Sequence, residues 1–316
     1  MEVRAMGVND AYSTLVKLVQ EHGVEEDSRN GRVLSIPEPV MLTTVNPTDR
    51  VLFDGTRDCN PFFHYMEALW ILAGRNDLAL IQRFNKRMAE YSDDGRTLYG
   101  AYGYRWRRGF AIDQLKECIR QLKADPDTRR CVLTTWTVED LPKQTKDKPC
   151  NTHIYFRIIE NRLDMTVCNR SNDLLWGMLG SNYVHFSFLH EYMSQSLAKT
   201  QGKLHQFTNN LHVYINDQWK RCADKVNNDW EYPKSIPLVW NTDNFLDEVA
   251  RALRGVEEKK EYMEFDNLPL RDALYMSAAW DAYQMQRYEL MDKNIREMHQ
   301  PDWRLACRQW INRRVV

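Results

Sequence analysis

The chain has 316 residues, which is enough for one large domain or two ordinary ones and for a sizeable hydrophobic core. Its 43 Lys and Arg residues nearly balance 44 Asp and Glu residues, which excludes a global basic field that would attract nucleic acid or an anionic membrane. An apolar content of 43% beside 28% charged residues indicates a folded chain, and no apolar run approaches the roughly 20 residues that span a bilayer.

The N-terminal residues lack the long apolar core of a secretory signal, so we expect a cytoplasmic protein. The seven cysteines are odd in number, and no two of them stand at the two-residue spacing that zinc sites favour. We therefore expect reduced thiols rather than a disulfide framework, and we predict no metal site.

The first predicted element is an amphipathic helix over residues 9–22, with Asn9 or Asp10 placed to accept hydrogen bonds from its first amides. The segment 32–45 alternates apolar and polar residues in the manner of half-buried strands. Residues 62–74 are apolar at helical spacing and end at a glycine, which predicts a largely buried helix.

A second amphipathic helix is predicted within residues 112–130, where it ends before Pro126. The apolar run 131–136 that follows it predicts a buried strand. Residues 153–169 have the pattern of two strands joined near residues 160–162.

The second half of the chain is mainly helical in pattern. A helix is predicted over residues 184–199 and a short strand over residues 211–215, and the pattern is helical from about residue 240 onward. No linker and no fixed-period repeat divides the chain. These elements predict an α+β fold, with a mixed sheet packed by helices, in a single catalytic domain over residues 1–316 whose residues 240–316 form a helical extension.

Cys150 is the sharpest single candidate for chemistry, because it follows a proline at the entrance to a predicted strand. A thiolate there could attack an electrophilic carbon if nearby cations lower its pKa. The alternative is that it is a small buried apolar residue, as most intracellular cysteines are.

Arginines offer a second candidate feature. Arg129 and Arg130 follow a predicted helix and turn, Arg29 and Arg32 flank a glycine, and Arg170 with Ser171 ends a predicted strand. Guanidinium forks and a hydroxyl match the acceptor oxygens of a phosphate, whereas ordinary surface salt bridges are the alternative reading.

Glu67 lies inside the apolar helix, where a carboxylate is unfavourable unless it is protonated, paired or used in proton transfer. His212 and Tyr214 stand two apart in a strand, so they share a face and could jointly hold a hydroxyl or form a structural pair. Polar residues before the 184–199 helix could read a base edge or cap that helix; these are Asn172, Asp173, Ser181 and Asn182.

These segments together resemble the thymidylate synthase superfamily, including its nucleotide hydroxymethylase branch. The resemblance covers roughly residues 12–216 and rests on six motifs in family order. They are ALWILAG preceded by Glu67, YGYRWR at 102–107, DPDTRR at 125–130, PCN at 149–151, NRSND at 169–173 and HVY at 212–214.

The resemblance implies a thymidylate synthase-like fold and a role for each matching residue. Cys150 resembles the thiolate that adds to C6 of a pyrimidine and so activates C5 toward 5,10-methylenetetrahydrofolate, the co-substrate. Glu67 and Tyr102 match positions that organise proton transfer through ordered water. Asp173 matches a folate-site carboxylate.

The remaining matches concern the nucleotide. Arg29, Arg170 and Ser171 match phosphate ligands, whereas Arg129 and Arg130 match a pair that reaches the phosphate in the other subunit's site, which implies a homodimer. The other matches concern the sugar and the base. His212 and Tyr214 correspond to the pair on the sugar 3′-hydroxyl, and Asn182 to the amide that reads the base, with Ser181 in the ungapped register.

Three departures from the synthase pattern concern the last step. The residue after the nucleophile is Asn151 instead of His, Met88 replaces an aromatic that covers the methylene intermediate, and the usual short extended C-terminus is replaced by predicted helix. Less shielding favours water over hydride at the C5 methylene. The resemblance therefore favours a 5-hydroxymethyl product over the methyl product of thymidylate synthase.

Asn182 favours a uracil ring, because one amide can serve both the N3–H donor and the O4 acceptor, whereas the hydroxymethylase of deoxycytidylate is expected to carry Asp there. The predicted substrate is thus dUMP, with dCMP and CMP left open. The alternative of another class is a catalytically silent nucleotide-binding or RNA-binding regulator on the same fold. Neither DNA nor membrane is an expected partner, since the charge is nearly balanced.

Overall fold

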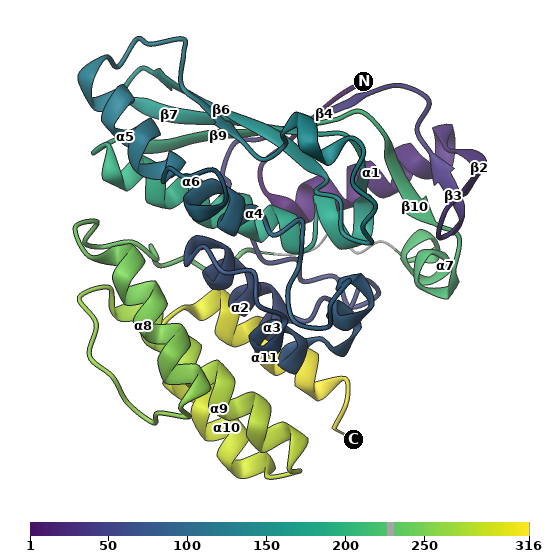
Figure 1. Cartoon of the computed structure of the whole chain (residues 1–316). Helices are drawn as coiled ribbons and strands as arrows, with labels where there is room; N and C mark the ends of the chain where they lie inside the picture. Colours follow the sequence, from purple (N-terminus) through teal and green to yellow (C-terminus); the bar gives the residue numbers. More distant parts are fainter. Residues whose placement is uncertain (226–230, 316) are drawn as a thin grey trace. The chain divides into compact units, whose positions relative to one another are not determined.

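The computed structural model describes residues 1–225 and 231–315 (Figure 1). The chain forms two compact units, each assembled from three separate segments. Unit 1 comprises Met1–Cys59, Gln114–Leu141 and Pro149–Glu231, and unit 2 comprises Asn60–Asp113, Pro142–Lys148 and Tyr232–Val316. The single catalytic domain expected from the sequence stays a prediction.

Unit 1 contains a six-stranded sheet in the order β1-β4-β9-β7-β6-β5. The β1–β4 and β7–β9 pairs are parallel and the other pairs antiparallel, which confirms the predicted mixed sheet. Its strands are β1 (Glu2–Ala5), β4 (Val40–Thr44), β5 (Val132–Thr134), β6 (Asn151–Ile159), β7 (Arg162–Asn169) and β9 (Thr200–Thr208).

A second, four-stranded sheet of unit 1 has the order β2-β3-β10-β8. The β2–β3 and β3–β10 pairs are antiparallel, and the short β10–β8 pair is parallel. The strands are β2 (Val24–Ser28), β3 (Gly31–Ser35), β8 (Asn172–Asp173) and β10 (Leu211–Tyr214).

The predicted β6–β7 hairpin is confirmed, and its turn shows why the chain reverses there. Glu160 and Asn161 have φ angles of 47° and 63°, which give the left-handed turn that matches the twist of a two-stranded ribbon. Along β7, Leu163, Met165 and Val167 are buried while the residues between them are partly exposed. This period of two places one face of the sheet against a helix.

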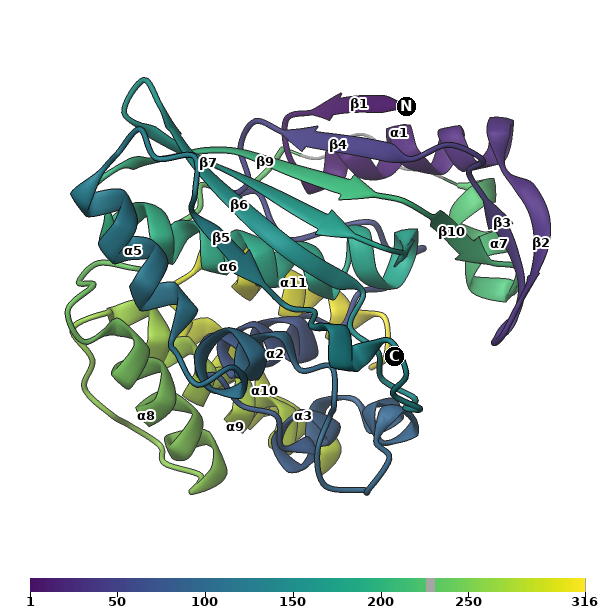
Figure 2. The ribbon, with the colours of Figure 1, turned by 45° about the horizontal axis from the view of Figure 1, so that its top comes forward.

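The helix that covers this face is α6 (Ser181–Ser196), which packs on β7 and β9. Figure 2 looks onto the opposite face, and in the described part of unit 1 no helix covers it. The other helical segments of unit 1 are α1 (Val8–His22), α5 (Gln114–Ala124), α7 (Asp217–Asp224) and the short turns η3 (Val138–Asp140) and η4 (Leu174–Met178).

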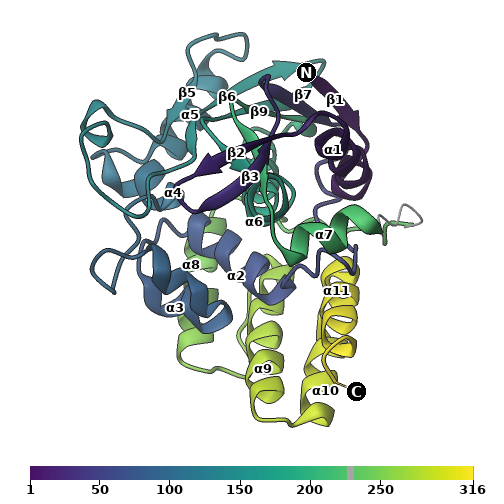
Figure 3. The same cartoon turned by 90° about the vertical axis from the view of Figure 1, so that its right-hand side faces the viewer.

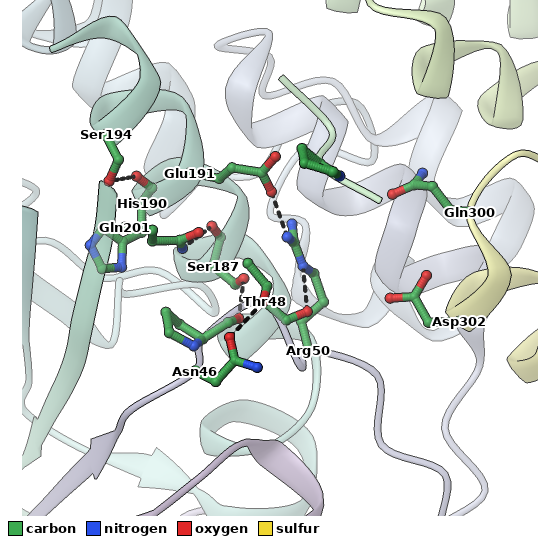
Figure 4. Close-up of polar contacts among 12 residues, drawn as sticks. Asn46, Thr48, Arg50, Ser187, His190, Glu191, Ser194, Gln201, Gln300 and Asp302 are labelled. Carbon is green, nitrogen blue, oxygen red and sulfur yellow. Dashed lines mark hydrogen bonds and ion pairs between the residues drawn. The ribbon is translucent and has the colours of Figure 1, made fainter. Parts of the chain in front are cut away.

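A buried ion pair lies in the interior of unit 1. Nη2 of Arg50 lies 2.5 Å from a carboxylate oxygen of Glu191 on α6, and both side chains are almost fully buried (Figure 4). The Arg50 guanidinium also lies 4.8 Å from the ring centre of Phe188, and its Nε donates to the Thr48 carbonyl. This pair ties the segment after β4 to the central helix.

Two local predictions in unit 1 are wrong. The α1 helix begins at Val8 after an extended Gly7, and neither expected residue caps it. Instead, the Asn9 side chain binds the Val51 carbonyl and the Phe53 amide. The Asp10 carboxylate accepts from the amide of Met6, before the helix. Both polar side chains therefore fasten loops to α1, because nearby backbone competes for the same groups.

The strand predicted within residues 131–136 exists, but it is only half-buried, with Leu133 fully buried and its neighbours partly or well exposed. The observed β5 pairs only with β6, at the edge of the sheet, and Val132 is 46% exposed. The Gln114 side chain supplies part of the missing neighbour, since its amide accepts from the Thr134 N–H and donates to the Thr134 carbonyl. An apolar run does not by itself distinguish an edge strand from a central one.

Unit 2 consists of helices, and Figure 3 shows α9, α10 and α11. All twelve residues of α2 are buried, as predicted for the apolar run, and Gly74 follows the helix with φ 66°. The helical pattern expected from about residue 240 is confirmed for the described residues, and residue 316 lies outside them. The helices are α2 (Pro61–Leu72), α3 (Leu78–Phe84), α4 (Tyr102–Tyr104), α8 (Phe245–Glu257), α9 (Asp272–Gln284), α10 (Tyr288–Glu297) and α11 (Pro301–Asn312), with η1 (Lys86–Tyr91), η2 (Arg105–Gly109) and η5 (Leu268–Arg271).

Among the described residues, none of the helices has both the length and the apolar character that a membrane-spanning helix needs.

Candidate active site

Cys150 lies in unit 1, immediately before β6, and is partly exposed. Its carbonyl accepts from the Arg170 amide at 2.9 Å. The preceding Pro149 carbonyl accepts from the Trp136 indole at 2.8 Å and from Arg170 Nε at 3.0 Å. Three hydrogen bonds thus fix the backbone at Pro149 and Cys150, and one of them holds the Arg170 side chain against the carbonyl of the residue before the thiol.

Asn151 is fully buried, and its amide is used inside the sheet. Its Oδ1 accepts from the Thr135 hydroxyl at 2.5 Å, and its Nδ2 donates to the Cys168 carbonyl at 3.0 Å. The amide therefore anchors the start of β6, where Cys150 is attached. The Asn151 side chain is therefore directed into the sheet.

The phosphate and sugar candidates Ser171, His212 and Tyr214 are brought together in unit 1. The Ser171 hydroxyl lies 3.5 Å from Nδ1 of His212, and the same nitrogen lies 2.9 Å from Oδ1 of Asn210. The His212 and Tyr214 rings meet edge to face with centroids 5.5 Å apart, which confirms that they share a face of β10. Because Arg170 precedes Ser171 and contacts Cys150, these side chains and the thiol occupy one region of unit 1.

Asp173 and the two alternatives for base reading lie around η4. Oδ1 of Asp173 accepts from the amides of Leu175 and Trp176 and so caps this turn. The Asn182 amide lies 3.4 Å from Oδ1 of Asn172 and is partly exposed, whereas Ser181 is buried. Burial therefore favours Asn182 over Ser181 as the residue that a ligand can reach.

The other predicted phosphate ligands are exposed and separate from this group. Arg29 occupies the tip of the β2–β3 hairpin, beyond the residues of β3 that pair with β10. Arg129 and Arg130 lie in the exposed loop between α5 and the edge strand β5. Their positions are those of residues that reach outward from unit 1.

Glu67 and Tyr102 belong to unit 2, where the helices that carry them are in contact. Gly103 sits so close to α2 that an added Cβ would lie 1.8 Å from the carbonyl oxygen of Ile71, one turn after Glu67. Glu67 is almost fully buried, and the rings of Tyr102 and Trp106 are 6.0 Å apart. The close packing of α4 on α2 thus positions the two predicted proton-transfer residues within one unit.

Met88, the second departure from the synthase pattern, is buried on η1 in unit 2. No group of three or more His, Cys, Asp or Glu side chains with a metal-binding arrangement occurs among residues 1–225 and 231–315. None of the seven cysteines, all of which lie in described segments, forms a disulfide.

Two residues of the region were missed by sequence reasoning. Thr135 is fully buried and holds Asn151, a contact between segments 16 residues apart that no local pattern signals. Asp147 stands three residues before Cys150, and its Oδ2 accepts from the Gly100 amide at 2.8 Å. A single acid between two lysines, so close to the candidate nucleophile, is the signal that could have drawn attention to it.

Unit 1 thus combines a mixed sheet with a partly exposed cysteine and with arginine, serine, histidine and tyrosine side chains near the same strand ends. The chain belongs to the thymidylate synthase family, whose sequence model matches residues 10–294. Among its relatives, the deoxyuridylate hydroxymethyltransferase of Pseudomonas phage M6 is 40% identical and is matched over 99% of this chain and 94% of its own length.

Two further relatives have the same name. The deoxyuridylate hydroxymethyltransferase of Bacillus phage SP01 is 33% identical, with 84% of this chain and 74% of that protein aligned. That of Delftia phage PhiW-14 is 31% identical, with 75% of this chain and 66% of that protein aligned.

Proposed function

We propose that this protein is a one-carbon transferase that converts dUMP into 5-hydroxymethyl-dUMP with 5,10-methylenetetrahydrofolate as co-substrate. Membership of the thymidylate synthase family and the similarity to three deoxyuridylate hydroxymethyltransferases support this activity. The structural observation that carries it is the partly exposed Cys150, fastened beside the Arg170 guanidinium at the start of β6.

In this proposal the reaction begins and ends at the Cys150 sulfur. The thiolate bonds to C6 of the uracil, and the electron pair displaced toward C5 forms a carbon–carbon bond with the methylene unit of the folate. Loss of the C5 proton and departure of tetrahydrofolate leave an exocyclic methylene. Water adds to it, the ring electrons return, and the sulfur is expelled as thiolate.

We propose that Arg29, Arg170 and Ser171 hold the nucleotide phosphate, and that His212 and Tyr214 hold the 3′-hydroxyl. Support comes from the 3.5 Å distance between the Ser171 hydroxyl and Nδ1 of His212, and from the hydrogen bond of the Arg170 amide to the Cys150 carbonyl. With Nδ1 of His212 bonded to the Asn210 side chain, its Nε2 is the nitrogen available to a sugar hydroxyl.

We propose that Asn182 reads the uracil edge and that Asp173 receives the pterin. The partial exposure of Asn182 supports a ligand-facing amide. One oxygen of Asp173 already caps η4, which holds the carboxylate in a defined orientation and leaves its second oxygen for a donor. The Asn182 amide matches uracil because its oxygen can accept from N3–H while its N–H donates to O4.

Glu67 and Tyr102 organise proton transfer in this mechanism. Burial of Glu67 on an apolar helix and the close contact between α2 and α4 support a fixed arrangement of the pair. The hydroxymethyl product is preferred over a methyl group because Asn151, which is directed into the sheet, and Met88 leave the methylene less shielded from water.

We further propose that the working form is a homodimer in the cytoplasm, and that the whole chain acts as one catalytic domain with a helical extension over residues 240–316. The face of the six-stranded sheet away from α6 carries partly exposed residues, Tyr155 among them, which a second copy could cover. The outward position of Arg129 and Arg130 suits a role in the partner's phosphate site.

The test is incubation of the protein with dUMP, dCMP or CMP and methylenetetrahydrofolate, followed by the mass of the nucleotide and the state of the folate. The expected result is 5-hydroxymethyl-dUMP with tetrahydrofolate. A methyl product with dihydrofolate would identify a thymidylate synthase, and nucleotide binding without any product would identify a silent regulator.

The nucleophile is tested by Cys150→Ala, which is expected to abolish tritium release from C5-tritiated dUMP while dUMP binding stays measurable. Cys168→Ala is the matched control. Cys168 is also partly exposed, and it contacts Asn151 through its backbone carbonyl, which the substitution keeps. Tritium release by Cys150→Ala at the wild-type rate would assign the nucleophile elsewhere.

A further inference from the structure

The indole of Trp136, which has no role in the proposed function, contacts the segment that carries the predicted nucleophile. Its Nε1 donates to the Pro149 carbonyl at 2.8 Å. Nε of Arg170 donates to the same oxygen at 3.0 Å, and the Arg170 amide donates to the Cys150 carbonyl at 2.9 Å. All four residues belong to unit 1, so these contacts lie within one compact part of the chain.

The backbone of Trp136 is itself held on both sides. The amides of Thr135 and Trp136 donate to the Thr152 carbonyl, at 2.8 and 3.2 Å. The next residue, Thr137, begins the η3 turn and exchanges hydrogen bonds with Asp140. The indole therefore projects from a backbone that is fastened to the strand of the nucleophile and to the following turn.

These hydrogen bonds determine how the thiol is presented. Because a peptide unit is planar, holding the Pro149 carbonyl holds the plane that includes the Cys150 nitrogen. The Arg170 amide holds the next plane through the Cys150 carbonyl. With both planes held, the Cys150 sulfur changes position only by rotation about the Cα–Cβ bond, among the staggered rotamers.

The indole can hold the Pro149 carbonyl independently of the nucleotide. In the proposed function the Arg170 guanidinium also binds the phosphate, so the carbonyl shares this cation with an anion. The indole N–H is an uncharged donor and has no such second task. The centre of the Trp136 ring lies 5.9 Å from the guanidinium carbon of Arg170, which is within the range of a cation–π attraction.

We propose that Trp136 is a positioning residue for the thiol attack on the pyrimidine. Its N–H holds the peptide unit of Cys150 in the orientation for attack, and its ring steadies the Arg170 guanidinium for the phosphate. This inference rests on the proposed function and adds to it a residue that acts through Cys150 and Arg170.

Two variants separate the N–H from the ring. Trp136→Phe removes the N–H and keeps an aromatic ring, so single-turnover tritium release from C5-tritiated dUMP with methylenetetrahydrofolate should fall about 10- to 100-fold. The Kd of dUMP should stay at the wild-type value. Trp136→Leu also removes the ring, so it should show the same loss of tritium release and a Kd of dUMP raised about 2- to 5-fold.

A matched control is available in unit 2. The Trp240 indole donates to the Pro237 carbonyl at 2.7 Å, and Trp240 is 53% exposed. Trp240→Phe removes a hydrogen bond of the same kind, and its tritium release and dUMP affinity should equal those of the wild type.

A third replacement keeps the test available if Trp136→Phe does not fold, as judged by circular dichroism. Incorporation of 3-benzothienylalanine in place of Trp136 keeps the two-ring shape and exchanges the indole N–H for a sulfur atom. The protein with this residue should show the same loss of tritium release as Trp136→Phe, with unchanged dUMP affinity.

The ratio of tritium release to dUMP affinity is the decisive readout. Tritium release at the wild-type rate by Trp136→Phe or by the benzothienyl protein would overturn the role of Trp136. An equal loss of dUMP binding and tritium release in these proteins would also overturn it, because it would indicate a general structural contribution. Failure of the wild type to release tritium or to form any product would instead overturn the proposed function.

Discussion

The buried imidazole of His190 should make the protein measurably less stable in mild acid. His190 lies on α6 (Figure 4) and is fully buried. Its Nε2 is 2.5 Å from the Leu163 carbonyl oxygen. A carbonyl only accepts, so Nε2 carries the proton of a neutral ring. Its Nδ1 has no hydrogen-bond partner within the described residues, and a second proton there would be a buried, unpaired donor.

Burial lowers the pKa of His190 from 6.5 to about 4, and the charges of His205 and Arg50 lower it further, while the Leu163 carbonyl and Asp164 oppose them. Because the folded-state pKa is the lower one, the unfolded chain binds more protons below pH 6.5. The stability that depends on neutral His190 is complete above that pH and is lost as the pH falls toward 4. The shift corresponds to about 3 kcal/mol in all, of which about 2 kcal/mol is lost by about pH 5.

The assay is urea unfolding of the wild type and His190→Gln at several pH values between about 7 and 5. Glutamine can donate to the Leu163 carbonyl but does not titrate, so the variant should lose about 2 kcal/mol less stability than the wild type over this range. His22→Gln is the control, because the side chain of His22 is 50% exposed. The same pH dependence in the wild type and His190→Gln would refute the assignment of a neutral buried ring.

Two other substitutions test packing in each unit. Glu191→Leu leaves the Arg50 guanidinium buried without its carboxylate and should lower the free energy of unfolding by about 3–5 kcal/mol, measured by urea denaturation; a loss below about 1 kcal/mol would contradict a buried pair. Gly103→Ala forces a methyl group onto the Ile71 carbonyl and should cost about 3 kcal/mol or more, with a lower melting temperature. Gly95→Ala, where no atom lies within 4 Å but φ is 71°, should cost only about 1 kcal/mol, and equal losses would refute the close approach.

The structure shows how the Asn151 side chain, at a position where the sequence departs from the synthase pattern, is used in the fold. Asn151 replaces the usual histidine of the synthases, and its amide is bonded to Thr135 and to the Cys168 carbonyl. An anchored amide holds the backbone of Cys150 but offers no titratable group.

Much of the architecture could be predicted from the sequence, because it depends on interactions between neighbouring residues. The largely apolar sequence of α2, the φ-positive turn between β6 and β7 and the alternation along β7 each depend on neighbouring residues only. The same is true of the motif around Cys150, whose residues are adjacent in the chain. Such features are determined before any tertiary contact forms, and the structure confirms the elements predicted from them.

The tertiary structure decided what each polar group does. Asn9 binds the 51–53 segment instead of capping α1, and β5 is an edge strand. The Asp147 carboxylate accepts a hydrogen bond from the Gly100 amide. Each outcome depends on desolvation and on hydrogen-bond partners contributed by residues distant in sequence. A one-dimensional pattern gives the kinds of side chain available, whereas their burial and their neighbours, and hence their pKa values and roles, arise only when the chain has folded.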